Sequence, residues 1–172
     1  NTAVYDLCMI NGINVKAKVP FGVLASVAPI VDFNPQAVRE MLAKIGVEFD
    51  ARDEERLVRV KNWITKHQPS KMYKLLEKRN DEYYSGLSDE EKAAVKKLAD
   101  YIEEHDNVKE QEIQQYLYGI INDPSLTKKE NMARQQKFFA VFYNVLFGCD
   151  KGPRLYLFLS AIDKSKYLNL LK

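Results

Sequence analysis

The chain has 172 residues, of which 46% are hydrophobic and 29% are charged, and its formal net charge at pH 7 is +2. These values are typical of one globular domain, or of two closely packed helical subdomains, that buries about 70% of its unfolded surface and needs no disulfide or metal. The small net charge excludes a strongly basic protein. No apolar run is long enough to span a bilayer, so we expect no membrane partner.

The residues that usually carry chemistry are few and scattered. Cys8 and Cys149 lie near opposite ends of the chain, which indicates neither a zinc site nor a redox motif. We expect two reduced thiols in a cytoplasmic protein, with a disulfide between the ends as the open alternative. His67 and His105 stand in no recognisable motif, and no glycine-rich phosphate loop is present. The sequence therefore predicts no catalytic and no metal-binding residue.

The first part of the chain predicts a linker and two helices. Residues 1–19 show little periodicity and are interpreted as an extended linker, with at most one short strand. An apolar helix begins at Val19-Pro20. Asn34 caps the next helix, Pro35 suits its first turn, and Gly46 ends it.

A third helix combines an apolar stripe with a basic face. Asp53 is its predicted N-cap. The residues of its buried stripe are Leu57, Val60 and Ile64. On another face three arginines lie three or four residues apart and are therefore close neighbours: Arg52, Arg56 and Arg59.

The middle of the chain predicts three more helices. Pro69 interrupts the pattern, and a short helix over about 70–79 should turn three residues inward: Met72, Leu75 and Leu76. The capping box of residues 88–91 begins a helix that extends to about Glu104. Asn107 begins another helix in the same way, with an apolar stripe of Ile113, Tyr116, Leu117 and Ile120.

The C-terminal third is the most informative part of the sequence. A third capping box, residues 127–130, begins a long aromatic helix whose stripe has helical period: Phe138, Val141, Phe142 and Val145. Gly148 ends this helix, because glycine takes the left-handed conformation without steric cost. Gly152-Pro153 begins a second apolar helix. Since every strong signal is helical, the fold class is all-α.

The pattern Gly148-x3-Gly152-Pro153-Arg154-Leu155 behind an aromatic helix resembles the C-terminal end of class I lysyl-tRNA synthetases. Upstream, the segment from Tyr5-Asp6-Leu7 to Val19-Pro20-Phe21 is similar to the point where that family leaves its catalytic half. Two residues depart from the pattern, because Tyr156 and Asp163 stand where small residues are expected.

The resemblance implies a bundle or cage of about seven to nine helices, as in the anticodon-binding domains of class I lysyl- and glutamyl-tRNA synthetases. Residues 1–19 would leave a catalytic part that is absent here, and residues 20–172 would form the anticodon-binding domain, with possible subdomains 20–106 and 107–172. The implied partners are the anticodon arm of lysine tRNA and the catalytic domain of the full-length chain. The parent enzyme would ligate lysine to tRNA with ATP and Mg²⁺, whereas this fragment would need no cofactor and be inactive alone.

Charge is unevenly distributed along the sequence. Residues 52–79 hold nine Lys and Arg against four Asp and Glu, residues 80–112 hold four against eleven, and residues 113–172 hold nine against four. Two basic segments around an acidic one could form a phosphate-attracting face with an acidic back. The alternative is a set of ordinary solvated helix faces.

Reading an RNA loop requires exposed planar or bidentate groups beside phosphate-binding cations. Two groups of residues meet this description. The first group is Arg52, Arg56, Arg59, Lys61 and Trp63. The second group is Lys128, Lys129, Arg134, Gln135, Gln136, Lys137, Lys151 and Arg154. The amides of Gln135 and Gln136 could bond uridine edges, which the uridine-rich anticodons implied by the resemblance make relevant.

Each candidate also has a structural explanation. Trp63 could fill core volume. Arg154 could bond the carbonyl groups that end the preceding helix. The main alternative function is a helical adapter whose basic faces bind an acidic protein partner.

Overall fold

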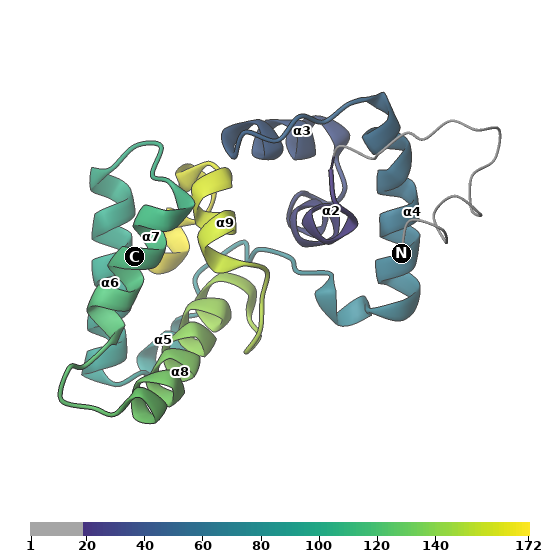
Figure 1. Ribbon diagram of the computed structural model, residues 1–172. Coiled ribbons are helices and arrows are strands. Elements are labelled where there is room, and N and C mark those ends of the chain that lie inside the picture. Colours follow the sequence, from purple (N-terminus) through teal and green to yellow (C-terminus); the bar gives the residue numbers. More distant parts are fainter. Residues whose placement is uncertain (1–18) are drawn as a thin grey trace.

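The computed structural model describes residues 19–172, so all of the predicted linker 1–19 except Val19, together with Cys8, lies outside the described residues. Within residues 19–172 the chain forms nine α-helices, three 3-10 turns and no strand (Figure 1). This confirms the all-α class and the expected number of helices. The α-helices are α2 (Phe21–Val27), α3 (Pro35–Lys44), α4 (Ala51–His67), α5 (Asp81–Ser85), α6 (Asp89–Glu104), α7 (Glu110–Ile121), α8 (Lys128–Phe147), α9 (Leu155–Ala161) and α10 (Leu168–Leu171). The 3-10 turns are η1 (Ala28–Val31), η2 (Pro69–Lys71) and η3 (Lys164–Lys166).

The helices gather in two lobes, which lie side by side in Figure 1. In the N-terminal lobe, residues 19–67, α4 packs against α2 and η1, and α3 packs against η1. The predicted stripe of α4 is buried, since Leu57, Val60 and Ile64 are at most 3% exposed. The apolar periodicity of this segment therefore does position the lobe's core.

The C-terminal lobe, residues 81–172, is built around the aromatic helix α8. Helices α6, α7 and α10 pack against α8, and α9 packs against α7. The stripe predicted for α8 is buried, with Phe142 fully inaccessible. Phe158 of α9 and Tyr167 extend this aromatic core, with their ring centroids 5.4 Å apart. The buried hydroxyl of Tyr167 donates to the carbonyl oxygen of Leu159 at 2.9 Å.

The segment that joins the lobes differs from the prediction. The prediction of a helix over 70–79 is wrong, because η2 is the only helical turn there and residues 72–80 have no regular secondary structure. The reason is tertiary: the N–H of Leu76 donates to the carbonyl of Leu146 at 2.9 Å, and Tyr73 lies against Phe147. These contacts replace helical hydrogen bonds and anchor the segment to the end of α8. Met72, expected inward, is 39% exposed.

Helix ends follow the sequence closely, with three exceptions. Asn34 caps α3, the capping boxes at 88–91 and 127–130 form, and Gly148 ends α8 at φ 69°. The cap of α4 is Asp50 rather than Asp53, because the Asp50 carboxylate accepts from the N–H groups of residues 52 and 53. Helix α7 begins after Lys109 rather than Asn107, and α9 begins at Leu155, two residues beyond Pro153.

The cap of α8 gives a first testable prediction. Thr127 Oγ1 accepts from the N–H of Glu130 at 3.3 Å and donates to its carboxylate at 2.6 Å. Replacing Thr127 by alanine should lower the free energy of unfolding by about 1 kcal/mol, which urea denaturation measures. The matched control is Thr65→Ala, an exposed residue in the last turn of α4. An equal effect of the two variants would contradict the role of the cap.

The two lobes meet where α3 packs on α9. Three ion pairs of α3 and α4 lie within the N-terminal lobe: Arg39 with Glu54, Arg52 with Asp50, and Arg56 with Asp53. The division into subdomains 20–106 and 107–172 stays a prediction. Helix α6 ends just before this expected boundary, and it packs against three helices that lie beyond it, α7, α8 and α10. No helix in the described part of the chain is long and apolar enough to cross a membrane.

Candidate nucleic-acid interface

The first candidate group forms a stripe along α4, here called the α4 stripe. Its members recur at i, i+4, i+7 and i+11, so they share one face of the helix: Arg52, Arg56, Arg59 and Trp63. The same period extends the stripe to Lys66 and His67, which were not among the predicted residues although their spacing is visible in the sequence. Lys61 lies on another face, with its ammonium group 5.4 Å from the ring centroid of Phe33.

Local contacts divide the arginines of the stripe into two kinds. Arg56 is half-buried and donates to the Asp53 carboxylate at 2.7 Å and to the carbonyl of Val19 at 2.6 Å, so it holds α4 against the start of the lobe. Arg52 pairs with the capping carboxylate of Asp50 at 3.1 Å. Arg59 is exposed and has no hydrogen bond or ion pair to any residue between 19 and 172. Arg59 is therefore the arginine of the stripe best placed to bind a phosphate.

The side chain of Trp63 lies at the surface rather than in the core. Its side chain is 37% exposed and meets Phe21, itself 42% exposed, at a ring-centroid distance of 5.2 Å and a right angle between the rings. The imidazole of His67 lies 6.2 Å away on the next turn. The alternative that Trp63 fills the core is therefore wrong. An exposed indole braced by a second ring and flanked by cations is a suitable platform for an unpaired base.

In the second candidate group, the guanidinium group of Arg134 is engaged by contacts within the protein. Its Nε donates to the carbonyl of Ile121 at 2.5 Å, a second nitrogen bonds Glu90, and the guanidinium lies 4.9 Å from the ring centroid of Phe138. The hydrogen bond from Arg134 holds the pKa of Glu90 below its usual range. Arg134 thus ties together the ends of α6, α7 and α8.

Other cations of the C-terminal lobe are paired in the same way. Lys137 lies 3.0 Å from the buried carboxylate of Glu91, and Arg154 lies 3.8 Å from Glu110. With Arg134, three candidates bind acids of the segment 80–112. Two further pairs have the same pattern, Lys164 with Asp106 and Lys172 with Glu103. Five of the nine basic residues in 113–172 therefore pair with acids of the segment 80–112, and these five do not extend the α4 stripe.

The remaining members of the second group are more accessible. Lys128, Lys129, Gln136 and Lys151 are exposed. Gln135 is half-buried, and its Nε2 donates to Oδ1 of Asn122 at 2.7 Å. Arg154 is exposed and pairs with Glu110, so the alternative that it bonds the carbonyls ending α8 finds no support in its contacts.

The two candidate groups lie in different lobes. In Figure 1, α4 lies at the far right, whereas the beginning of α8 lies at the lower left. The structure therefore does not join them into one continuous face, and each must be considered as a separate surface.

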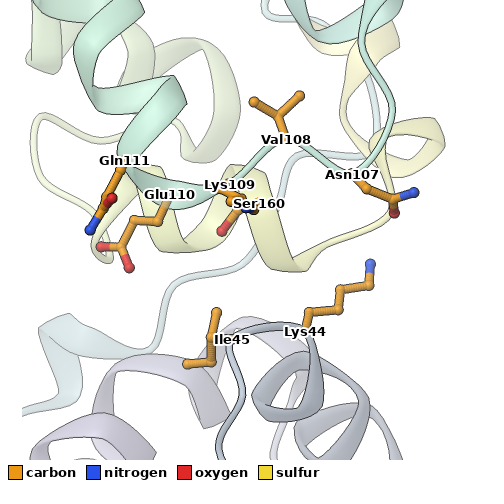
Figure 2. A pocket seen from close by; sticks show the side chains of 8 residues that line it. All are labelled: Lys44, Ile45, Asn107, Val108, Lys109, Glu110, Gln111 and Ser160. Atoms are coloured by element: carbon orange, nitrogen blue, oxygen red, sulfur yellow. The ribbon is translucent and has the colours of Figure 1, made fainter.

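A cavity of about 550 Å³ lies where the lobes meet, and none of the thirteen residues predicted from the sequence lines it. In Figure 2, Lys44 and Ile45 at the end of α3 face the start of α7 and Ser160 of α9 across this seam. Its charged side chains are mixed in sign, Lys44 and Lys109 with Glu110. Among residues 19–172, no three His, Cys, Asp or Glu side chains gather as a metal site would require.

No family model matches the chain. The lysine–tRNA ligase of Pyrococcus horikoshii is 24% identical to it over 164 residues, which are 91% of this chain and 29% of the ligase. The lysine–tRNA ligase of Picrophilus torridus is 28% identical over 166 residues, which are 94% of this chain and 30% of the ligase. The chain is similar to lysine–tRNA ligases. This similarity confirms the resemblance to lysyl-tRNA synthetases, the same enzymes under another name. The chain spans less than a third of the lysine–tRNA ligases that it matches.

Proposed function

We propose that the chain is the tRNA-binding module of a lysine–tRNA ligase and that the α4 stripe is its principal RNA contact. The observation that carries the proposal is the exposed Trp63–Phe21 pair on a basic helix face, in a chain similar to enzymes that are named for tRNA. The RNA class follows from that name, and the contact surface follows from the geometry.

The stripe offers two kinds of contact that single-stranded RNA requires. The open surface of Trp63 stacks on a base, a contact that contributes roughly 1–3 kcal/mol in comparable proteins. Arg59 and Lys66, one turn on either side of the indole, bind the adjacent phosphates. Phosphate contacts supply affinity that depends on salt, and the stacked base requires an unpaired loop.

The finer proposal is that the bound loop is the anticodon arm of lysine tRNA. The module would position the tRNA so that its acceptor end reaches the catalytic part of the same enzyme, where ATP and Mg²⁺ are used. The uridine-rich anticodon supplies unpaired bases, and the bent arm presents phosphates on both sides of them. Positioning of this kind needs no catalytic side chain in the module itself.

The test compares Trp63→Ala and Arg59→Ala with unmodified protein in titrations of lysine tRNA at two salt concentrations. We expect Trp63→Ala to weaken binding about tenfold and Arg59→Ala about fivefold, the latter with a smaller salt dependence. The first control is Val58→Ala, because the Val58 side chain is 63% exposed on another face of α4. The second control is Lys97→Ala, which removes an equal charge at an exposed position of α6. Thermal unfolding checks that every variant is folded.

Three probes separate this function from the adapter alternative. These are lysine tRNA, the same tRNA with a substituted anticodon, and heparin. Preference for the unmodified anticodon supports the anticodon proposal. Equal affinity for the two tRNAs removes it. Equal affinity for heparin and tRNA shows a general polyanion surface, as expected of an adapter for an acidic protein.

A further inference from the structure

A groove between α7 and α8, here called the α7–α8 groove, was not expected from the sequence. It is an open hollow of about 580 Å³. Its lining residues include Tyr118 of α7, Asn122 and Asp123 just beyond the end of α7, and Lys128, Asn131, Met132 and Gln135 of α8. The α8 residues stand at i, i+3, i+4 and i+7, so one face of α8 forms a complete wall. Resting on the proposed function, we propose that this groove holds a single unpaired nucleobase of the RNA and reads its hydrogen-bonding edge.

The turn between the helices fixes the shape of the groove. Oδ1 of Asn131 accepts from the N–H of Asp123 at 2.9 Å, and Nδ2 of Asn131 donates to the carbonyls of Asp123 and Leu126 at 2.8 and 3.2 Å. One side chain thus bonds the connection between α7 and α8 at three points. The wall is rigid before any ligand binds, which lowers the entropy cost of binding.

An amide pair provides the polar edge of the groove. Nε2 of Gln135 donates to Oδ1 of Asn122 at 2.7 Å, and this bond orients both amides. Oε1 of Gln135 is then left as an acceptor and Nδ2 of Asn122 as a donor. Every base presents a donor beside an acceptor on its Watson–Crick edge, so a fixed acceptor–donor pair can bond an unpaired base and discriminate by the order of its groups.

Aromatic and thioether surfaces provide the apolar part. The ring centroid of Tyr118 lies 6.2 Å from that of Tyr156, and Tyr156 meets Phe139 edge-to-face at 5.7 Å. The Tyr118 side of the groove is therefore supported by the aromatic residues beneath it. Burial is the largest cause that raises the pKa of Tyr156, and the neighbouring Tyr118 hydroxyl adds to it, so the hydroxyl stays neutral. Met132 is 53% exposed on the rim, where its flexible thioether can cover a planar ring. Exposed Lys128 also lines the groove, and in this proposal its ammonium group binds the phosphate next to the base.

The experiment uses the full chain with Gln135→Leu and Met132→Ala, and with Gln136→Leu as the matched comparison. Gln135 and Gln136 are equivalent in the sequence, but only Gln135 lines the groove. The probes are lysine tRNA and a series of the same tRNA in which one anticodon-loop nucleotide at a time is abasic or carries another base. Urea denaturation confirms that each variant is folded.

For unmodified protein we expect one loop position at which the abasic nucleotide weakens binding about tenfold. Gln135→Leu should bind all bases at that position with equal affinity, Met132→Ala should weaken binding of the intact tRNA, and Gln136→Leu should behave as unmodified protein. If Gln135→Leu and Met132→Ala both retain the discrimination and affinity of unmodified protein, the groove proposal is overturned while tRNA binding stands. If unmodified protein binds tRNA no better than heparin, the proposed function itself fails.

Discussion

Replacing Arg134 by alanine should lower the free energy of unfolding by about 2–4 kcal/mol and leave the tRNA affinity of the folded protein within about twofold. The sequence places Arg134 among RNA-binding candidates, but its guanidinium is engaged with the Ile121 carbonyl, with Glu90 and with the ring of Phe138. Removing it leaves a helix-terminal carbonyl without its donor and uncovers part of a buried ring. A partner left unsatisfied costs more than the bond itself contributes.

Two control variants separate the contributions of the apolar stem, the hydrogen bonds and the ion pair of Arg134. Arg134→Met keeps the apolar stem over Phe138 and removes the hydrogen bonds, so it should recover part of the loss. Glu90→Gln should have a small effect, because the Glu90 side chain is 59% exposed and solvent weakens its ion pair. Urea denaturation gives the stability and tRNA titration gives the affinity. A stable Arg134→Ala protein with a large loss of tRNA affinity would show that Arg134 binds RNA instead.

Glu91 should give the second large effect, and this effect should depend on pH. The residue is 7% exposed, its carboxylate accepts from the N–H and hydroxyl of Ser88 at 2.8 Å each, and Lys137 lies 3.0 Å away. Burial acts to raise the pKa of Glu91, but the hydrogen bonds from Ser88 and the Lys137 ammonium outweigh it and hold the pKa below its usual range. Glu91→Ala should cost about 2–3 kcal/mol at pH 7, because it removes a capping box and charged hydrogen bonds together.

The sign of the pH dependence follows from that lowered pKa. The folded state binds the Glu91 proton less readily than the unfolded chain, whose pKa is about 4.3. The stabilisation is therefore complete above that pH and is lost as pH falls through the folded-state pKa. Urea denaturation between pH 7 and pH 3 should show a smaller acid loss in Glu91→Gln than in unmodified protein. Parallel pH curves for the two proteins would contradict the lowered pKa.

The parts of the fold that depend on local chemistry were predictable. Side-chain caps at Ser88 and Thr127, the left-handed Gly148 and the buried stripe of α8 each involve residues within one or two helical turns. The segment 70–79 was not predictable in the same way. Its Leu76 bonds Leu146, seventy residues away along the chain, and such a contact has no trace in local periodicity.

The candidate site is likewise predictable in its local pattern but not in its long-range contacts. Residue type and spacing predict the α4 stripe, but they cannot distinguish Arg56, which donates to the distant carbonyl of Val19, from Arg59, which is exposed. Equally, Lys137 looks like a phosphate-binding lysine until Glu91 is placed beside it. Long-range pairing decides which cations remain available, and pairing depends on how α6 packs on α8.

The way the lobes are joined has a consequence for any ligand that spans them. Among the stronger helix contacts α3 on α9 joins them, the segment 68–80 links them along the chain, and a cavity of about 550 Å³ lies between their polar edges. We therefore expect the angle between the lobes to change more readily than the packing within each lobe. An RNA that occupies the α4 stripe and the α7–α8 groove together would fix the angle between the lobes. The protein would then favour RNAs whose bend matches the separation of these two surfaces.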